Sequence, residues 1–98
     1  MPDEILMIPD YVNMPADAAR LNVTWDGANG FLTDPIPFDA NDTDIRAMAT
    51  EALRNGDIPG IPASMGANLD DFIVDRFNST EDVPYARVFV RPKTPFGV

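Results

Sequence analysis

The side chains of this chain that could act in catalysis are carboxylates. The sequence has no cysteine and no histidine, which excludes thiol nucleophiles, imidazole acid–base catalysis and the usual ligand sets for zinc, haem or iron–sulfur clusters. Adjacent acids occur at Asp70-Asp71, near Asp75, and at Glu81-Asp82. Neighbouring carboxylates on an extended chain point apart, and no nucleophile accompanies them. We therefore expect no catalytic residue, no cofactor and no enzymatic activity.

The acidic run from Asp39 to Asp44 has the alternating oxygens of a calcium-binding loop. Such a loop needs glycine at its sixth position and a bidentate glutamate at its twelfth. This chain has Asp44 and Thr50 at those positions. Helix capping explains the run better, with Asp42 or Thr43 accepting hydrogen bonds from the first-turn amides. We expect no metal site.

The charges are unevenly distributed along the chain. The 98 residues include 16 acidic and 7 basic ones, for a net charge of −9. Every acidic residue lies at or before Asp82, whereas Arg87, Arg91 and Lys93 follow it without an acid among them. Nucleic acids and anionic membranes bind clustered lysine and arginine, so the overall charge argues against both. We expect protein partners, for which the basic end offers an attractive surface.

Arg87, Phe89 and Arg91 alternate along a predicted strand and therefore share its outward face. Arginine and aromatic side chains are enriched at protein interfaces. We predict that these three residues bind a partner. The alternative is that they pack against another part of the same fold.

Residues 1–19 are predicted to form an extended arm in front of a domain that spans residues 20–98. Pro9 and Pro15 interrupt any regular period in the arm. Its large apolar side chains would be exposed to water unless they docked on the domain or on a partner. We predict partner contacts for four of them, namely Ile5, Leu6, Ile8 and Tyr11.

The first part of the domain is predicted to be a β-hairpin. Leu21, Val23 and Trp25 alternate with polar residues, which indicates a half-buried strand. A turn is expected within residues 26–30, followed by a second strand over residues 31–38. Pro35 and Pro37 share one parity in that strand, so we expect an edge strand whose prolines face away from the first strand.

A helix over residues 44–54 is the clearest predicted element. Its apolar residues recur with the period of one helix face, and Gly56 follows as the stop signal. Residues 57–67 are expected to cross the core irregularly, pinned by Ile58 and Ile61. Residues 72–77 are compatible with a short strand or a helical turn. The last strand is expected over residues 85–91, with Ala86, Val88 and Val90 directed inward.

The order of these elements resembles that of the ubiquitin-like β-grasp family, an α+β fold with one amphipathic helix packed on a small mixed sheet. The resemblance covers roughly residues 20–97 and is one of pattern and loop position. The segments that carry it are the hairpin Leu21–Phe38, Asn41-Asp42-Thr43 before the helix Asp44–Arg54, the turn Asn68–Phe72, and Val88–Arg91 in the last strand.

This resemblance implies a non-enzymatic protein that is recognised through its surface, either as a modifier or as an adaptor. Modifiers of the family, bacterial ones included, are conjugated through a C-terminal glycine by activating and conjugating enzymes. Here the corresponding residue is Gly97, and Val98 must first be removed. Lys93 is the only lysine, so chains of copies would have one internal linkage site.

A second function fits the same residues. A small structural subunit of a virion or another large assembly would use the N-terminal arm and the basic last strand for contacts with neighbouring subunits. In both cases we expect a cytoplasmic protein, since the sequence has no cysteine, no secretory signal pattern and no apolar stretch of about 20 residues.

Overall fold

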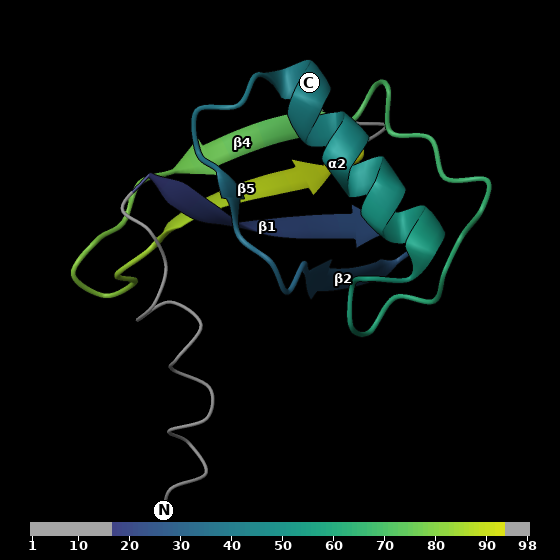
Figure 1. Cartoon of the computed structure of the whole chain (residues 1–98), viewed down its shortest axis with the longest axis horizontal. Helices are drawn as coiled ribbons and strands as arrows, with labels where there is room; N and C mark the ends of the chain where they lie inside the picture. The colour runs from purple at the N-terminus through teal and green to yellow at the C-terminus, as the bar shows by residue number, and fades with distance from the viewer. Residues whose placement is uncertain (1–16, 94–98) are drawn as a thin grey trace, which may run out of the picture.

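A computed structural model describes residues 17–93 of the chain. Within this range the protein is a small α+β domain in which one helix packs against one face of a mixed five-stranded sheet (Figure 1). This is the coarse architecture that the sequence predicts. The elements are β1 (Ala18–Trp25), β2 (Ala28–Phe31), β3 (Ile36–Pro37), α2 (Asp42–Asn55), β4 (Ile73–Phe77) and β5 (Ala86–Arg91).

The sheet has the order β2-β1-β5-β4, and the short strand β3 also pairs with β1. β1 and β5 lie side by side at the centre and run parallel, with Leu21 opposite Val88. All other pairs are antiparallel. Since parallel strands require a crossover connection, α2 and the residues that follow it carry the chain over one face, as Figure 1 shows.

The hairpin differs from the prediction in its second strand. Asp26 and Gly27 have φ angles of 52° and 81°, so these two residues form the whole turn and β2 begins already at Ala28. The expected strand over residues 31–38 is wrong. It is divided into β2 and β3, because five positions separate Phe31 from Ile36 whereas only three separate their partners Asn22 and Ala19 on β1, so two extra residues interrupt the ladder. The predicted parity holds at the end of this segment, since the amide of Phe38, which alternates with the prolines, donates to the Asp17 carbonyl before β1 at 3.0 Å.

The helix is confirmed, but its N-terminal cap was assigned to the wrong residue. Asn41 is the cap, and its Oδ1 accepts from the Asp44 amide at 2.8 Å. Asp42, one of the predicted caps, lies in the first turn and forms an ion pair with Arg76 at 2.7 Å. The helix ends as predicted at Gly56, whose φ is 75°.

The core lies between α2 and the inward face of the sheet. Residues 57–67 form no helix or strand, and Ile58 and Ile61 are buried, both as predicted. The ambiguity over residues 72–77 is settled in favour of a strand, β4. The buried apolar side chains are Ala19, Leu21, Val23, Ile36, Ile45, Ala49, Ala52, Leu53, Ile58, Ile61, Ala67, Leu69, Val88 and Val90. No helix in the described part of the chain is long and apolar enough to span a membrane.

Candidate functional site: the open face of the sheet

The candidate site is the face of the sheet opposite to α2, called here the open face. Alternation along the central strands determines which side chains reach it. Leu21 and Val88 point into the core, so Arg20 on β1 and Arg87 on β5 point to the open face. The register places Arg20 opposite Arg87, and Arg87 opposite Phe77 of β4. A line of two arginines and one phenylalanine therefore crosses three strands.

A second line crosses the open face next to the first. Here Asn22 of β1 lies between Phe31 of β2 and Phe89 of β5, and Phe89 lies opposite Asp75 of β4. Together the two lines bring three phenylalanines from three different strands onto one surface. These strands lie far apart in the sequence, and their pairing alone creates the surface.

The rings and guanidinium groups on this face contact one another. Phe89 packs edge-to-face against Phe31 and against Phe77, with ring centroids 6.4 Å and 5.4 Å apart. Arg20 lies over the Phe31 ring at 5.1 Å, and Arg87 lies over the Phe77 ring at 5.4 Å. Both contact types are attractive, because the ring edge is positive and the ring face is negative. We call these five residues the arginine–phenylalanine cluster.

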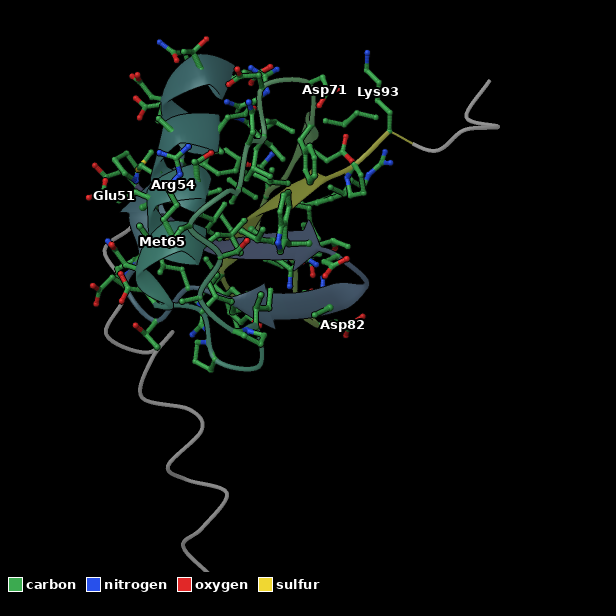
Figure 2. The ribbon with its side chains drawn as sticks, turned by 90° about the vertical axis from the view of Figure 1, so that its right-hand side faces the viewer. Glu51, Arg54, Met65, Asp71, Asp82 and Lys93 are labelled. Atoms are coloured by element: carbon green, nitrogen blue, oxygen red, sulfur yellow. The ribbon has the colours of Figure 1, made fainter. Side chains whose placement is uncertain are left out.

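One member of the cluster is strongly exposed. Phe77 is 46% exposed, and it is one of two large apolar side chains in the described range with this degree of exposure, the other being Met65 at 79%. Phe77 belongs to β4, which is an edge strand of the sheet. Met65 follows α2 in the sequence and lies on the helix side of the sheet (Figure 2). The cluster thus offers an apolar ring beside cationic groups.

An amide pair forms the polar border of the cluster. Asn22 Nδ2 donates to Asn29 Oδ1 at 3.1 Å, and Asn29 Nδ2 donates to Asn22 Oδ1 at 2.6 Å and to Thr24 Oγ1 at 2.8 Å. Asn22 is only 2% exposed, because it is covered between Phe31 and Phe89. The pair satisfies a buried amide and holds β2 in register with β1.

The electrostatics of the open face differ from those of the whole chain. Three of the seven basic residues lie on it, against the carboxylate of Asp75. Asp75 accepts a hydrogen bond from Arg91 Nε at 2.8 Å, and both side chains are more than a third exposed. Arg87 donates one long hydrogen bond, at 3.4 Å, to the Asn78 carbonyl. The face is therefore cationic on a protein whose net charge is −9.

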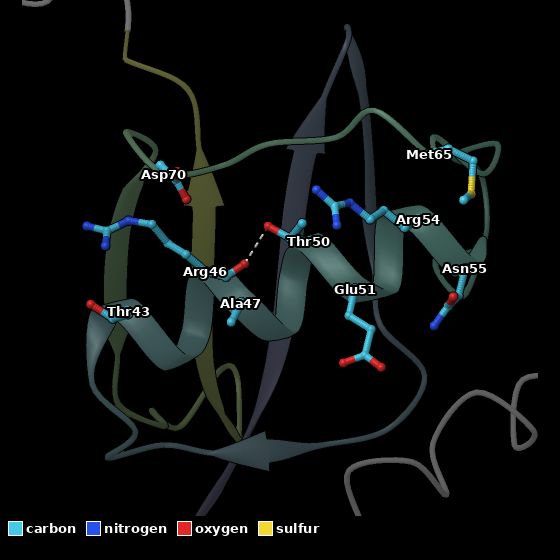
Figure 3. A pocket seen from close by; sticks show the side chains of 9 residues that line it. All are labelled: Thr43, Arg46, Ala47, Thr50, Glu51, Arg54, Asn55, Met65 and Asp70. Atoms are coloured by element: carbon cyan, nitrogen blue, oxygen red, sulfur yellow. Dashed lines mark hydrogen bonds between the residues drawn. The ribbon is translucent and has the colours of Figure 1, made fainter.

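A groove of about 790 Å³ beside α2 is the competing candidate (Figure 3). Arg46 and Arg54 lie along it, and both are used to hold the segment after the helix. Arg46 Nε donates to the Phe72 carbonyl at 2.9 Å, and Arg54 donates twice to the Ala67 carbonyl, at 3.2 Å and 3.0 Å. Because the groove also has acidic side chains along its walls and its arginines serve the fold, the open face is the better candidate.

The structure places three of the predicted partner-binding residues together. Arg87, Phe89 and Arg91 lie on the open face of β5, so their predicted outward orientation is confirmed. Lys93 is exposed and lies just beyond β5, away from α2 (Figure 2). The remaining predicted site residues lie outside the described range, namely Gly97, Ile5, Leu6, Ile8 and Tyr11.

Three residues of the cluster were not predicted as site residues: Arg20, Phe31 and Phe77. Strand alternation already directs Arg20 away from the core, but no local signal indicates that β1 pairs with β5 or that β4 brings Phe77 beside Arg87. Among residues 17–93, no group of three or more acidic, histidine or cysteine side chains is arranged to hold a metal ion.

Comparison with known protein families, with curated protein sequences and with solved structures found no match for this chain.

Proposed function

We propose that this chain is a non-enzymatic, ubiquitin-like β-grasp module that binds other proteins through the open face of its sheet. The observation that carries the proposal is the arginine–phenylalanine cluster, with the Phe77 ring 46% exposed beside Arg87. Arginine and aromatic side chains form the centres of many protein interfaces, because a planar group and a rigid ring give large contact area at little entropic cost.

The β-grasp part of the proposal is supported by the topology. A hairpin, β1–β2, is followed by a helix across one face, and the last strand, β5, lies parallel to β1 at the centre of the sheet. This order is compatible with the β-grasp fold. In such a domain the open face is the large surface that the helix leaves accessible.

Photo-crosslinking at matched positions tests the binding face. A benzophenone amino acid is placed at Phe77 in one variant and at Met65 in another, since both side chains are exposed but lie on opposite sides of the sheet. In extracts of the source cells we expect defined protein adducts from position 77 that disappear when Arg87 is replaced by glutamine. Equal adducts from both positions, or none from position 77, would contradict the proposal.

We further propose that the protein acts either as an adaptor or as a modifier that is conjugated through Gly97 after Val98 is removed. This branch is tested by expressing a tagged chain that ends at Gly97, with a Gly97→Ala chain of the same length as the control. A modifier gives higher-mass adducts that survive boiling in detergent and depend on Gly97. Adducts that form equally with alanine, or no adducts at all, leave only the adaptor branch. We propose the cytoplasm as the compartment for either branch.

An assembly subunit is the second candidate, because a cationic face on an acidic protein can also attract copies of the same chain. Light scattering separates the two functions. A subunit forms an oligomer whose mass falls between low and physiological salt, whereas the proposed binding module is a monomer at both.

A further inference from the structure

One end of the open face has the chemistry to bind an acidic, apolar segment. Arg20, Arg87 and Phe77 lie in one line across β1, β5 and β4. Guanidinium groups attract carboxylates, and the 46% exposed ring of Phe77 offers an apolar surface at the end of the line. A segment that combines carboxylates with aliphatic or aromatic side chains is complementary to this line.

Residues 1–16 of the chain have this composition. They contain three acidic residues, no lysine and no arginine. They also contain large apolar side chains, which would be exposed to water without a docking surface. The relevant residues are Asp3, Glu4, Ile5, Leu6, Ile8, Asp10 and Tyr11.

The segment is joined to the sheet at the correct end. Asp17 is tied to the sheet, since its carbonyl accepts from the Phe38 amide at 3.0 Å. Arg20, the first residue of the line, follows only three positions later. The point at which residues 1–16 meet the described domain is therefore about 10 Å along β1 from the line they would cover.

The segment is also long enough. Neighbouring strands are about 4.8 Å apart, so the line across three strands is about 10 Å long, and the path from Asp17 along β1 and then along the line to Phe77 is about 20 Å. An extended chain advances about 3.3 Å per residue, so the seven residues that precede Asp17 extend about 23 Å. Asp10 and Tyr11 can therefore reach Phe77. A segment tethered this closely has an effective concentration in the millimolar range, which favours it over a free competitor.

We propose that residues 1–16 dock on the arginine–phenylalanine cluster of their own chain, with their carboxylates near the guanidinium groups and their apolar side chains against Phe77. The docking itself does not depend on the proposed function.

Paramagnetic relaxation tests the docking in the full-length chain. The protein has no cysteine, so a nitroxide on Met7→Cys is the only label. We expect loss of the amide signals of Phe77 and Phe89 on the open face, while the signals of Thr50 and Glu51 on the helix are retained. Equal losses on both faces, or no loss, would overturn the proposal.

A mixed sample identifies the occupant of the face. Spin-labelled protein without isotope is added to ¹⁵N protein without the label, so that only contacts between two chains can broaden signals. We expect no loss of open-face signals in this sample. Loss there would assign the surface to the segment of a second copy, contrary to docking within one chain.

Charge variants test the chemistry of the contact. Changing Asp3→Asn, Glu4→Gln and Asp10→Asn together leaves residues 17–93 intact, and we expect it to abolish the selective loss. Arg87→Gln is expected to do the same, whereas Arg54→Gln, on the helix side, is expected to retain it. Selective loss that persists in the triple variant would refute the charge complementarity, even if Arg87→Gln proved unable to fold. A partner test that fails while these signals behave as expected would reject the proposed function and not the docking.

Discussion

Replacing Asn22 and Asn29 by leucine, singly and together, tests whether the amide pair of the open face is held by the need to satisfy a buried group. Asn22 is 2% exposed, whereas Asn29 is exposed. Two reciprocal hydrogen bonds join them, and Asn29 has a further bond to Thr24. Leucine has the branching of asparagine, with two methyl groups in place of the amide oxygen and nitrogen, so the substitutions remove the polar groups and keep the shape of the side chain at a somewhat larger volume.

The two single variants should differ although they break the same pair. Asn29→Leu leaves the Asn22 amide buried under an apolar cover without a partner, which costs roughly 1–3 kcal/mol. Asn22→Leu removes the buried polar group, and the amide of Asn29 can still bond to Thr24 and to water, so the free energy of unfolding should stay within about 1 kcal/mol of the wild type. In the double variant no buried amide remains. It should therefore be more stable than Asn29→Leu alone.

Urea unfolding of the four proteins, followed by circular dichroism, gives the free energies for a double-mutant cycle. The expected signature is rescue: the second substitution raises the stability of the Asn29→Leu protein. If the double variant is less stable than Asn29→Leu, or if the two single variants lose the same free energy, burial of the Asn22 amide does not determine the energetics of the pair.

Three further predictions are checked by the same urea measurement. Gly30→Ala should destabilise the fold by about 1–3 kcal/mol, because a Cβ at Gly30 would lie 2.6 Å from the Pro59 carbonyl oxygen. Gly66→Ala is the control and should be nearly neutral, since a Cβ there meets no atom within 4 Å. Equal effects of the two substitutions would contradict the close packing at Gly30. Leu53→Ala should lower the free energy of unfolding by about 2–5 kcal/mol, because Leu53 is 1% exposed and its truncation opens a cavity under the helix. Wild-type stability of this variant would show that the helix buries another face. Arg91→Gln should cost less than about 1 kcal/mol, as the ion pair with Asp75 is exposed to solvent; a larger loss would mean that this pair holds β4 on β5.

Local patterns predicted the elements and their faces, because burial of alternate residues is a local property. The alternation around Leu21 and around Val88 correctly gave the inward faces of β1 and β5, and the helical period of Ile45 and Leu53 gave the buried side of α2. The division of residues 28–37 into β2 and β3 was missed. It results from two extra residues between Phe31 and Ile36 relative to their partners on β1, and no local pattern marks this shift in register.

The site was only half predictable, since it is made by pairing between distant strands. Arg87, Phe89 and Arg91 share one strand, and their period is visible in the sequence. Arg20 and Phe77 join them only through the β1–β5 and β4–β5 registers, which no local pattern specifies. Asn22 shows the same limit, because its position among polar residues suggested the solvent face and only the neighbouring rings bury it.

The arginine–phenylalanine cluster stabilises the sheet even if nothing binds to it. Its ring pairs and arginine–ring contacts contribute about 0.5–1.5 kcal/mol each, and this explains Phe89, whose ring lies between two others on an interior strand. Phe77 takes part in two of these contacts, with Phe89 and with Arg87, but they leave nearly half of its surface in water on an outer strand. An exposed apolar ring on such an edge favours aggregation, so fold stability gives little reason for the exposed part of this side chain. Phe77→Ser should therefore weaken partner binding far more than it weakens the fold, because much of the ring gains nothing from folding.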